Sequence, residues 1–341
     1  MLESIWFILW GVLWAVYFML DGFDLGIGTL MPFLAGNEAD KQMFYGAMGP
    51  HWDGNEVWLI AAGGVTFAAF PTAYAVMFSG LYSALMLVLF ALIFRGVAIE
   101  YRNKVNDPTW KRTWDCCLVA GSFIPALLLG VAFANIFKGI PIDAEGVYQG
   151  TLLTLLNPYG ILGGVLFVAM FLLHGSLWLL VKASGPVHER AAAVVNRFWV
   201  ALAVVLVGFL IATWFATSLF DNYIQGPLMA GVPIILIPVI VVGALIMVRV
   251  CLGKKRWWSA WFASSALIVG VTLFGVAGLY PNLLPSSLDP TFSITIHNSA
   301  SSQLTLKIML AVALTFVPVV IAYQAWAYNL FKEPIKEGGA D

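Results

Sequence analysis

MLESIWFILWGVLWAVYFMLDGFDLGIG, residues 1–28, begins with an apolar run that decides the fold class. The run has no basic segment before it and no small-residue cleavage site after it, so it predicts a first membrane span rather than a cleaved signal. Similar runs recur along the 341-residue chain, which is 61% hydrophobic and only 10% charged. No soluble core absorbs that much apolar surface, so the sequence predicts a polytopic membrane protein.

The apolar runs predict nine membrane-spanning helices in one integral membrane domain covering residues 1–341. An all-helical fold follows, because lipid offers no partner for an open strand edge and the alternation of a closed barrel is not visible. The second run is short and turns into the third at Phe70–Pro71. The predicted spans are 5–33, 54–69, 74–100, 114–137, 157–182, 194–218, 229–250, 258–280 and 303–331.

The basic residues predict how the chain crosses the membrane. If the connections are assigned alternately to the two sides, 14 of the 17 Lys and Arg residues fall on the side opposite the N-terminus. Lys and Arg accumulate in cytoplasmic connections. We therefore expect the N-terminus outside and the C-terminus in the cytoplasm. The net charge of −1 and the lack of a basic domain argue against a nucleic-acid partner.

Ionisable side chains gather near the expected cytoplasmic ends of several spans. Such residues are costly within a membrane and are functional candidates by default. They predict a vestibule that protons can enter from the cytoplasm, with an arginine as the counter-charge. The residues are Asp21 and Asp24 on the first span, His51, Asp53 and Glu56 at the start of the second, Arg95 and Glu100 on the third, and Asp115 on the fourth.

Structural roles compete with this interpretation. Asp53 and Glu56 have the spacing of a helix capping box, and Asp21 and Asp24 could form a structural lock with Arg95. Gly22 and Gly26 form a GxxxG pattern, which favours close helix packing.

Other chemistries have little support in the sequence. His174, deep in the fifth span, fits a hydrogen-bonded core histidine better than a haem ligand. We find no P-loop, dinucleotide fingerprint or paired Cys/His metal pattern. The chain is therefore expected to carry no catalytic residue, metal site or redox centre of its own.

DGFDLGIG (21–28) followed by PHWDGNEVWL (50–59) resembles the signature of subunit II of cytochrome bd ubiquinol oxidase, whose close relative is subunit II of the cyanide-insensitive oxidases. The resemblance is collinear over nearly the whole chain. It includes FSGLYSALMLVL (78–89), FRGVAIEYR (94–102), WDCCLVAGSFIPALLLGVAFAN (114–135), LLNPYG (155–160) and SSQLTL (301–306).

The resemblance implies a fold of two four-helix bundles plus a peripheral helix, in a bacterial or archaeal cytoplasmic membrane. It implies a pseudo-symmetric partner, subunit I, which holds two b-type haems, one d-type haem and the quinol site, and often a small single-span accessory subunit. The complex reduces O2 to water and generates proton-motive force without pumping. By motif, Asp53 matches the family's acid in the cytoplasmic proton route, and Asp21, Asp24 and Arg95 match positions near it. Some members hold a structural quinone near Trp52.

Two alternatives remain at this stage. A proton-coupled secondary transporter would also use intramembrane acids, but its charges usually lie near the membrane midplane. A purely structural subunit would differ only in whether the acids carry protons.

Overall fold

The computed structural model describes residues 1–225 and 236–335 of the chain. The first half contains the helices α1 to α8, with a short 3-10 helix, η1, after α5. Their bounds are α1 Leu2–Leu34, α2 Glu38–Met48, α3 Trp52–Ala69, α4 Pro71–Gly80, α5 Tyr82–Tyr101, η1 Arg102–Lys104, α6 Pro108–Lys138, α7 Leu152–Leu155 and α8 Pro158–Lys182.

The second half contains five more helices, a two-stranded antiparallel sheet and a 3-10 helix between the strands. Their bounds are α9 Gly185–Ala216, α10 Leu219–Gln225, α11 Leu236–Gly253, α12 Trp257–Leu279, β1 Asn282–Leu284, η3 Pro290–Phe292, β2 Ile294–Thr295 and α13 Gln303–Leu330.

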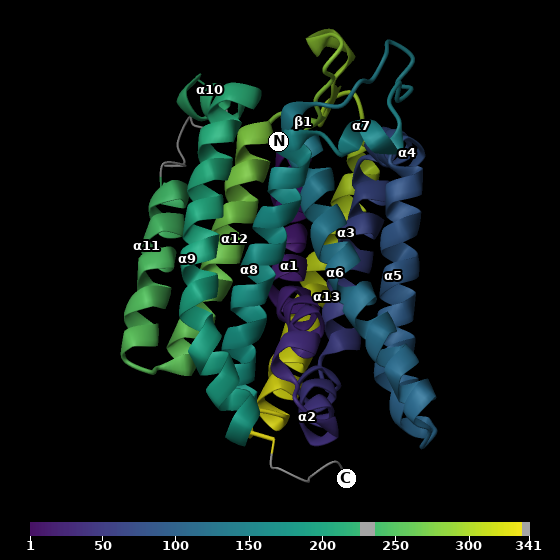
Figure 1. Cartoon of the computed structure of the whole chain (residues 1–341). Helices are drawn as coiled ribbons and strands as arrows, with labels where there is room; N and C mark the ends of the chain where they lie inside the picture. Colours follow the sequence, from purple (N-terminus) through teal and green to yellow (C-terminus); the bar gives the residue numbers. More distant parts are fainter. Residues whose placement is uncertain (226–235, 336–341) are drawn as a thin grey trace.

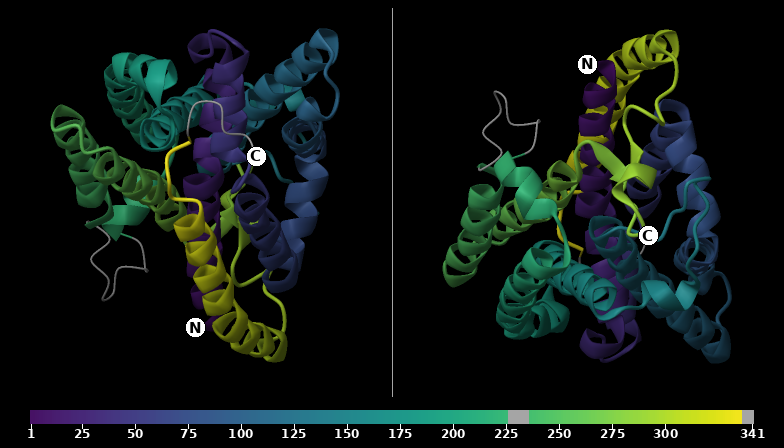
Figure 2. Two further views of the ribbon diagram at one scale, coloured as in Figure 1. Left: turned by 90° about the horizontal axis from the view of Figure 1, so that it is seen from below. Right: turned by 90° about the horizontal axis from the view of Figure 1, so that it is seen from above.

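Helix α1 is the centre of the molecule and contacts α3, α6, α8 and α12. The long helices of the first half, α1, α3, α5 and α6, form one group, and α8, α9, α11 and α12 form a second group beside it (Figure 1; Figure 2). Helix α13 packs on α1 and α3 at the edge of the molecule, and nearly all its side chains are at least partly exposed. The expected arrangement of two bundles and one peripheral helix is therefore present in the described part of the chain.

The two ends of the molecule differ in charge and structure. The described C-terminal end of the chain lies at the lower end in Figure 1 with α2 and the α5–α6, α8–α9 and α11–α12 connections, and these segments with the adjoining helix ends hold most of the Lys and Arg residues. The N-terminus lies at the upper end with the sheet, α7 and α10. There the segment between α12 and α13 forms an ordered cap, which the backbone of Ile140 joins through Pro285 and Ser287.

Eight helices in the described ranges are long and apolar enough to cross a membrane. Helix α3 is not among them, since Asp53, Asn55 and Glu56 make its first turns polar. It nevertheless joins α2 at the lower end of the molecule to α4 at the upper end (Figure 1). The ninth predicted crossing therefore depends on α3.

Two predicted spans need comment. The span predicted over 74–100 is wrong as a single helix, because the chain turns at Leu81 and divides it into α4 and α5. Tyr148 of the α6–α7 connection packs against Gly80 at this turn, and a Cβ atom on Gly80 would lie 2.7 Å from the Tyr148 Cβ. The start of the span predicted over 229–250 lies outside the described residues; the described part, α11, begins at Leu236.

Close helix contacts at glycine hold α1 in the centre. A Cβ atom on Gly26 would lie 1.9 Å from the backbone oxygen of Phe171 on α8, and one on Gly175 would lie 2.7 Å from the backbone of Gly26. Gly22 lies one turn away against the Phe171 ring. The GxxxG pattern of α1 is therefore a helix–helix contact, as expected for small residues in membrane helices.

Candidate functional site: a buried cluster of carboxyl groups

The centre of the candidate site is the Arg95 guanidinium on α5, which is fully buried. Its Nη2 donates to Asp21 Oδ1 on α1 over 2.6 Å and also to Glu56 Oε1 on α3. Glycine at position 121 of α6 allows this approach, since a Cβ there would lie 2.9 Å from the Arg95 Cβ. The cluster thus joins three helices of the first bundle through a single guanidinium.

Asp24 is the third carboxyl group of this cluster, and its partner is neutral. It is fully buried on α1, and its Oδ2 accepts a 2.7 Å hydrogen bond from the Asn55 side-chain amide on α3. Because Arg95 pairs with Asp21 and Glu56, Asp24 lacks a cation of its own in the described ion pairs. The lock expected between Arg95 and both α1 acids is therefore correct for Asp21 and wrong for Asp24.

The three carboxyl groups outnumber the guanidinium. Full ionisation of all three would leave two buried negative charges uncompensated, which is strongly unfavourable in a low-dielectric interior. We expect the cluster to bind at least one proton.

Exposure decreases stepwise from Asp53 to this cluster. Asp53 is exposed, the Glu56 side chain is 22% exposed, and the Asp21 side chain is 0% exposed. Asp53 and Glu56 are three residues apart on α3, so they lie on the same face of the helix. Asp53 makes no ion pair in the described ranges, and its carboxylate accepts only the neighbouring Gly54 N–H.

The predicted capping box is wrong. Helix α3 begins at Trp52, with His51 as its N-cap residue and no side-chain cap. Asp53 is therefore in the first turn rather than at the N-cap, and Glu56 is held by Arg95 instead of reaching back to the helix start. An ion pair with a buried guanidinium is stronger than a hydrogen bond to an exposed backbone N–H.

His51 and Glu100 do not join the carboxyl cluster. Glu100 is exposed on α5. His51 is buried and stacks on Tyr328 of α13, with ring centroids 4.4 Å apart. Burial, together with nearby Lys182, lowers the pKa of His51 to about 4, so its imidazole is neutral at physiological pH.

A second charged cluster lies nearer the lower end of the molecule and contains Asp115. Arg102 donates from Nε to Asp115 Oδ1 over 2.6 Å and from Nη1 and Nη2 to Glu38, while Lys41 pairs with Asp115 over 2.8 Å. The hydrogen bond from Arg102 lowers the pKa of Glu38 to about 2. Lys111 of α6 also lies 3.5 Å from Glu38, so three cations surround two carboxylates, which suits a structural lock between α2, η1 and α6.

Several polar partners of the site were not predicted from the sequence. Gln324 and Tyr328 of α13 both donate to Asn55 Oδ1, over 3.2 and 2.8 Å, and Trp58 Nε1 donates to Gln324. Gln324 and Tyr328 are four residues apart on one helix face, a spacing that could have marked them. Asn55 connects this α13 face to Asp24.

His174 does not fit a haem ligand. His174 has both ring nitrogens engaged, one by Ser264 and one by the Met19 carbonyl, as expected for a core histidine. His51 is enclosed by aromatic rings, and no group of three His, Cys, Asp or Glu residues in those ranges could hold a metal ion.

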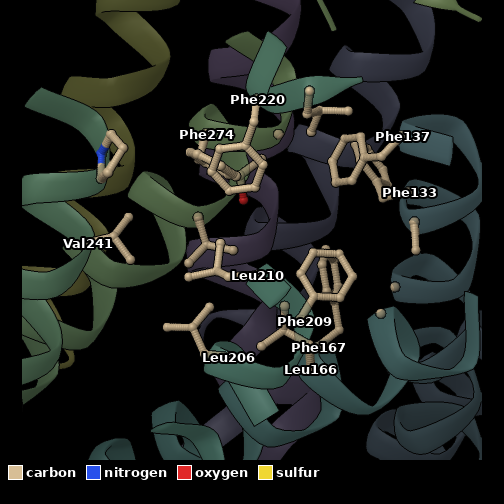
Figure 3. A pocket seen from close by; sticks show the side chains of 18 of the residues that line it. Phe133, Phe137, Leu166, Phe167, Leu206, Phe209, Leu210, Phe220, Val241 and Phe274 are labelled. Atoms are coloured by element: carbon tan, nitrogen blue, oxygen red, sulfur yellow. The ribbon is translucent and has the colours of Figure 1, made fainter. Parts of the chain in front are cut away.

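A separate pocket lies between α6, α8, α9, α10, α11 and α12 (Figure 3). Its lining is made of phenylalanine, leucine, valine and glycine with one alanine, one proline and one threonine, and it contains no titratable side chain. It is therefore not part of the carboxyl cluster, which belongs to α1, α3 and α5.

The fold and the site define a polytopic membrane protein with buried carboxyl groups near its more basic end. The sequence profile of the family described as cytochrome bd terminal oxidase subunit II matches residues 2–331. The chain is 38% identical to cytochrome bd-I ubiquinol oxidase subunit 2 of Escherichia coli (strain K12), over 98% of this chain and 96% of that protein. It is 34% identical to cytochrome bd ubiquinol oxidase subunit 2 of Bacillus subtilis (strain 168), over 98% and 97%.

A solved structure shares the fold. The bd oxidase of Geobacillus thermodenitrificans aligns with a TM-score of 0.76 and 17% identity, covering 97% of this chain and 98% of the matched chain. The chain belongs to the cytochrome bd terminal oxidase subunit II family. It is therefore a multi-pass membrane subunit of an oxidoreductase complex of the respiratory chain, whose haem cofactors and partner subunit I the family implies.

Proposed function

We propose that this chain supports the haem-bearing subunit I of a quinol:O2 oxidoreductase and supplies protons to it from the cytoplasm. The observation that carries the proposal is the cluster of Asp21, Asp24 and Glu56 around Arg95, with more carboxyl groups than cations. The two b-type haems and the d-type haem would lie in subunit I, where they would supply the chemistry of quinol oxidation and O2 reduction.

The proposed route follows the decrease in exposure. The Asp53 carboxylate takes a proton from water at the cytoplasmic end, and Glu56, on the same face of α3, receives it. Arg95 donates to Glu56 and Asp21 from one nitrogen, so it holds these two carboxyl groups next to each other. Asp24 lies one turn along α1 and takes the proton without opposing a positive charge. The side chains of His51 and Glu100 make no hydrogen bond or ion pair with this route in the described ranges.

The proposal also covers the orientation of this chain in the membrane and the other components of the complex. The basic end would face the cytoplasm, with the N-terminus outside, and reduction of O2 would generate proton-motive force without pumping. A structural quinone would lie beside Trp52, whose half-buried ring packs over Gly96, the residue after Arg95. A small single-span accessory subunit would complete the complex, and membrane lipid would surround it.

The test uses the purified complex with Asp53→Asn and Asp21→Asn in this chain. We expect O2 consumption with quinol as donor to fall at least several-fold, while the optical spectrum of the haems stays the same. Glu100→Gln is the matched control, because Glu100 is an exposed acid on α5 near the same end. Full turnover by both Asn variants in a correctly assembled complex would leave these acids with only a structural role.

A further inference from the structure

One face of α1 carries buried polar atoms that have no partner among the described residues. Trp14 Nε1, Tyr17 OH, Asp21 Oδ2 and Asp24 Oδ1 are all buried and unpartnered. Their positions are spaced by three, four and three residues, which places them along one face of the helix. The ten residues from Asp24 to Trp14 rise about 15 Å along α1.

The unpartnered atoms concentrate around this face. Of the twelve unpartnered buried side-chain atoms in the described ranges, seven belong to these four residues and to Arg95 and Ser122. Ser122 on α6 touches α1 one turn below Asp24, since a Cβ on Gly28 would lie 2.0 Å from its Oγ. Buried polar groups are almost always hydrogen-bonded, so this face requires further partners.

Subunit I cannot supply these partners directly. The atoms are already buried within this single chain, so a neighbouring subunit on its surface would not reach them. Water can, because buried water in proteins typically makes about three hydrogen bonds to such groups. The polar face of α1 is therefore expected to hold ordered water molecules.

The polar face has a defined outer end. One turn beyond Trp14, Trp10 Nε1 donates to Thr66 Oγ1 over 2.9 Å, and Thr66 donates to the Ala62 carbonyl. Farther out, Trp6 Nε1 donates to the Leu306 carbonyl. These groups are satisfied by protein, so the unpartnered stretch extends only from Ser122 to Trp14.

We infer that the Tyr17 hydroxyl is a proton-transfer group that extends the route from Asp21 outward along α1 through water. Tyr17 lies one turn beyond Asp21, and helical side chains lean towards the N-terminus, so the Asp21 carboxyl leans towards Tyr17. A hydroxyl both donates and accepts, which allows it to pass a proton between two water molecules. Trp14 only donates, so it orients water and cannot relay. The inference rests on the proposed proton uptake by this chain.

Tyr17→Phe removes the hydroxyl and keeps the ring. We expect the purified complex to assemble with unchanged haem spectra, to lose at least three-fold in O2 turnover, and to show a larger solvent deuterium isotope effect. A structural role would leave the isotope effect unchanged. Tyr159→Phe is the matched control, since Tyr159 is a buried tyrosine that bonds Thr213 in the second bundle; it should behave as the wild type.

The outcomes separate this inference from the proposed function. If Tyr17→Phe keeps full turnover and a normal isotope effect while Asp21→Asn is slow, the route does not use Tyr17 but uptake by this chain stands. If both variants are normal, both proposals are wrong. If Tyr17→Phe does not assemble, a structure of the wild-type complex that resolves ordered water provides the test. Water density between Tyr17 and Asp21 would support the relay, and a contact without water would overturn it.

Discussion

At the scale of single residues, Arg95 determines whether three acids can be buried together. Its side chain is as buried as those of Asp21 and Asp24, and it bonds two of the three carboxyl groups that surround it. The sequence predicted Arg95 as the counter-charge because it lies within a predicted span, near the same end as the acids. It could not predict which acids pair with it, since those choices depend on how α1, α3 and α5 are turned relative to one another.

Removing the guanidinium should prevent assembly rather than only slow turnover. Arg95→Leu leaves the carboxyl groups of Asp21 and Glu56 without a cation, and breaking a buried ion pair in this way costs about 3–5 kcal/mol. We expect a large loss of assembled, haem-containing complex, measured by the haem absorbance of purified membranes. Arg249→Leu is the control, because Arg249 is exposed and bonds Asn196.

A triple variant separates stability from proton transfer. Replacing Arg95, Asp21 and Glu56 together by leucine removes the buried charges of the pair network, and such replacements are often neutral for stability. Assembly should therefore recover while O2 turnover stays low. Equal loss of assembly in the single and triple variants would contradict this explanation, because the triple variant leaves no carboxylate of the pair network without its cation.

At the scale of helices, apolar runs predicted most elements because a membrane span must be continuously apolar. The break at Leu81 gave no such signal, because α4 and α5 are equally apolar and the turn depends on contact between Gly80 and Tyr148 from a distant segment. The role of Asn55, Gln324 and Tyr328 was missed for the same reason. Gln324 and Tyr328 meet Asn55 across some 270 positions; their spacing marks a polar helix face but does not identify the residue that this face contacts.

The contact between α1 and α8 predicts that alanine lowers the stability of the complex at some glycine positions and leaves it unchanged at others. Gly26→Ala would place a methyl group 1.9 Å from the Phe171 carbonyl oxygen, so the helices must separate. Overpacking of this kind costs about 1–3 kcal/mol or more. We expect a lower apparent Tm of the purified complex. Gly208→Ala, on α9 with nothing within 4 Å of the added Cβ, should keep the wild-type Tm, and equal Tm values for the two variants would contradict the contact.

At the scale of the whole molecule, the side of the membrane from which the carboxyl cluster takes protons depends on two features. These are the distribution of charge between the two ends and whether α3 crosses the membrane. Carboxyl groups near the basic end serve uptake from the cytoplasm only if that end faces the cytoplasm. The orientation in turn requires an odd number of crossings between the N-terminus and the C-terminal end. Eight helices in the described ranges meet the usual length and hydropathy for a span, so this orientation requires α3 to be the ninth crossing.

Cysteine labelling tests this topology directly. In a Cys116→Ser background, Thr72→Cys lies on α4 just beyond the outer end of α3, and Lys104→Cys lies in η1 at the basic end; both positions are exposed. A membrane-impermeant maleimide added to intact cells should label Thr72→Cys and leave Lys104→Cys unmodified, with the reverse in inverted vesicles. If both cysteines react from the same side, α3 does not cross the membrane. Labelling of Lys104→Cys alone in intact cells would place the carboxyl cluster on the outer side, where it could not take protons from the cytoplasm.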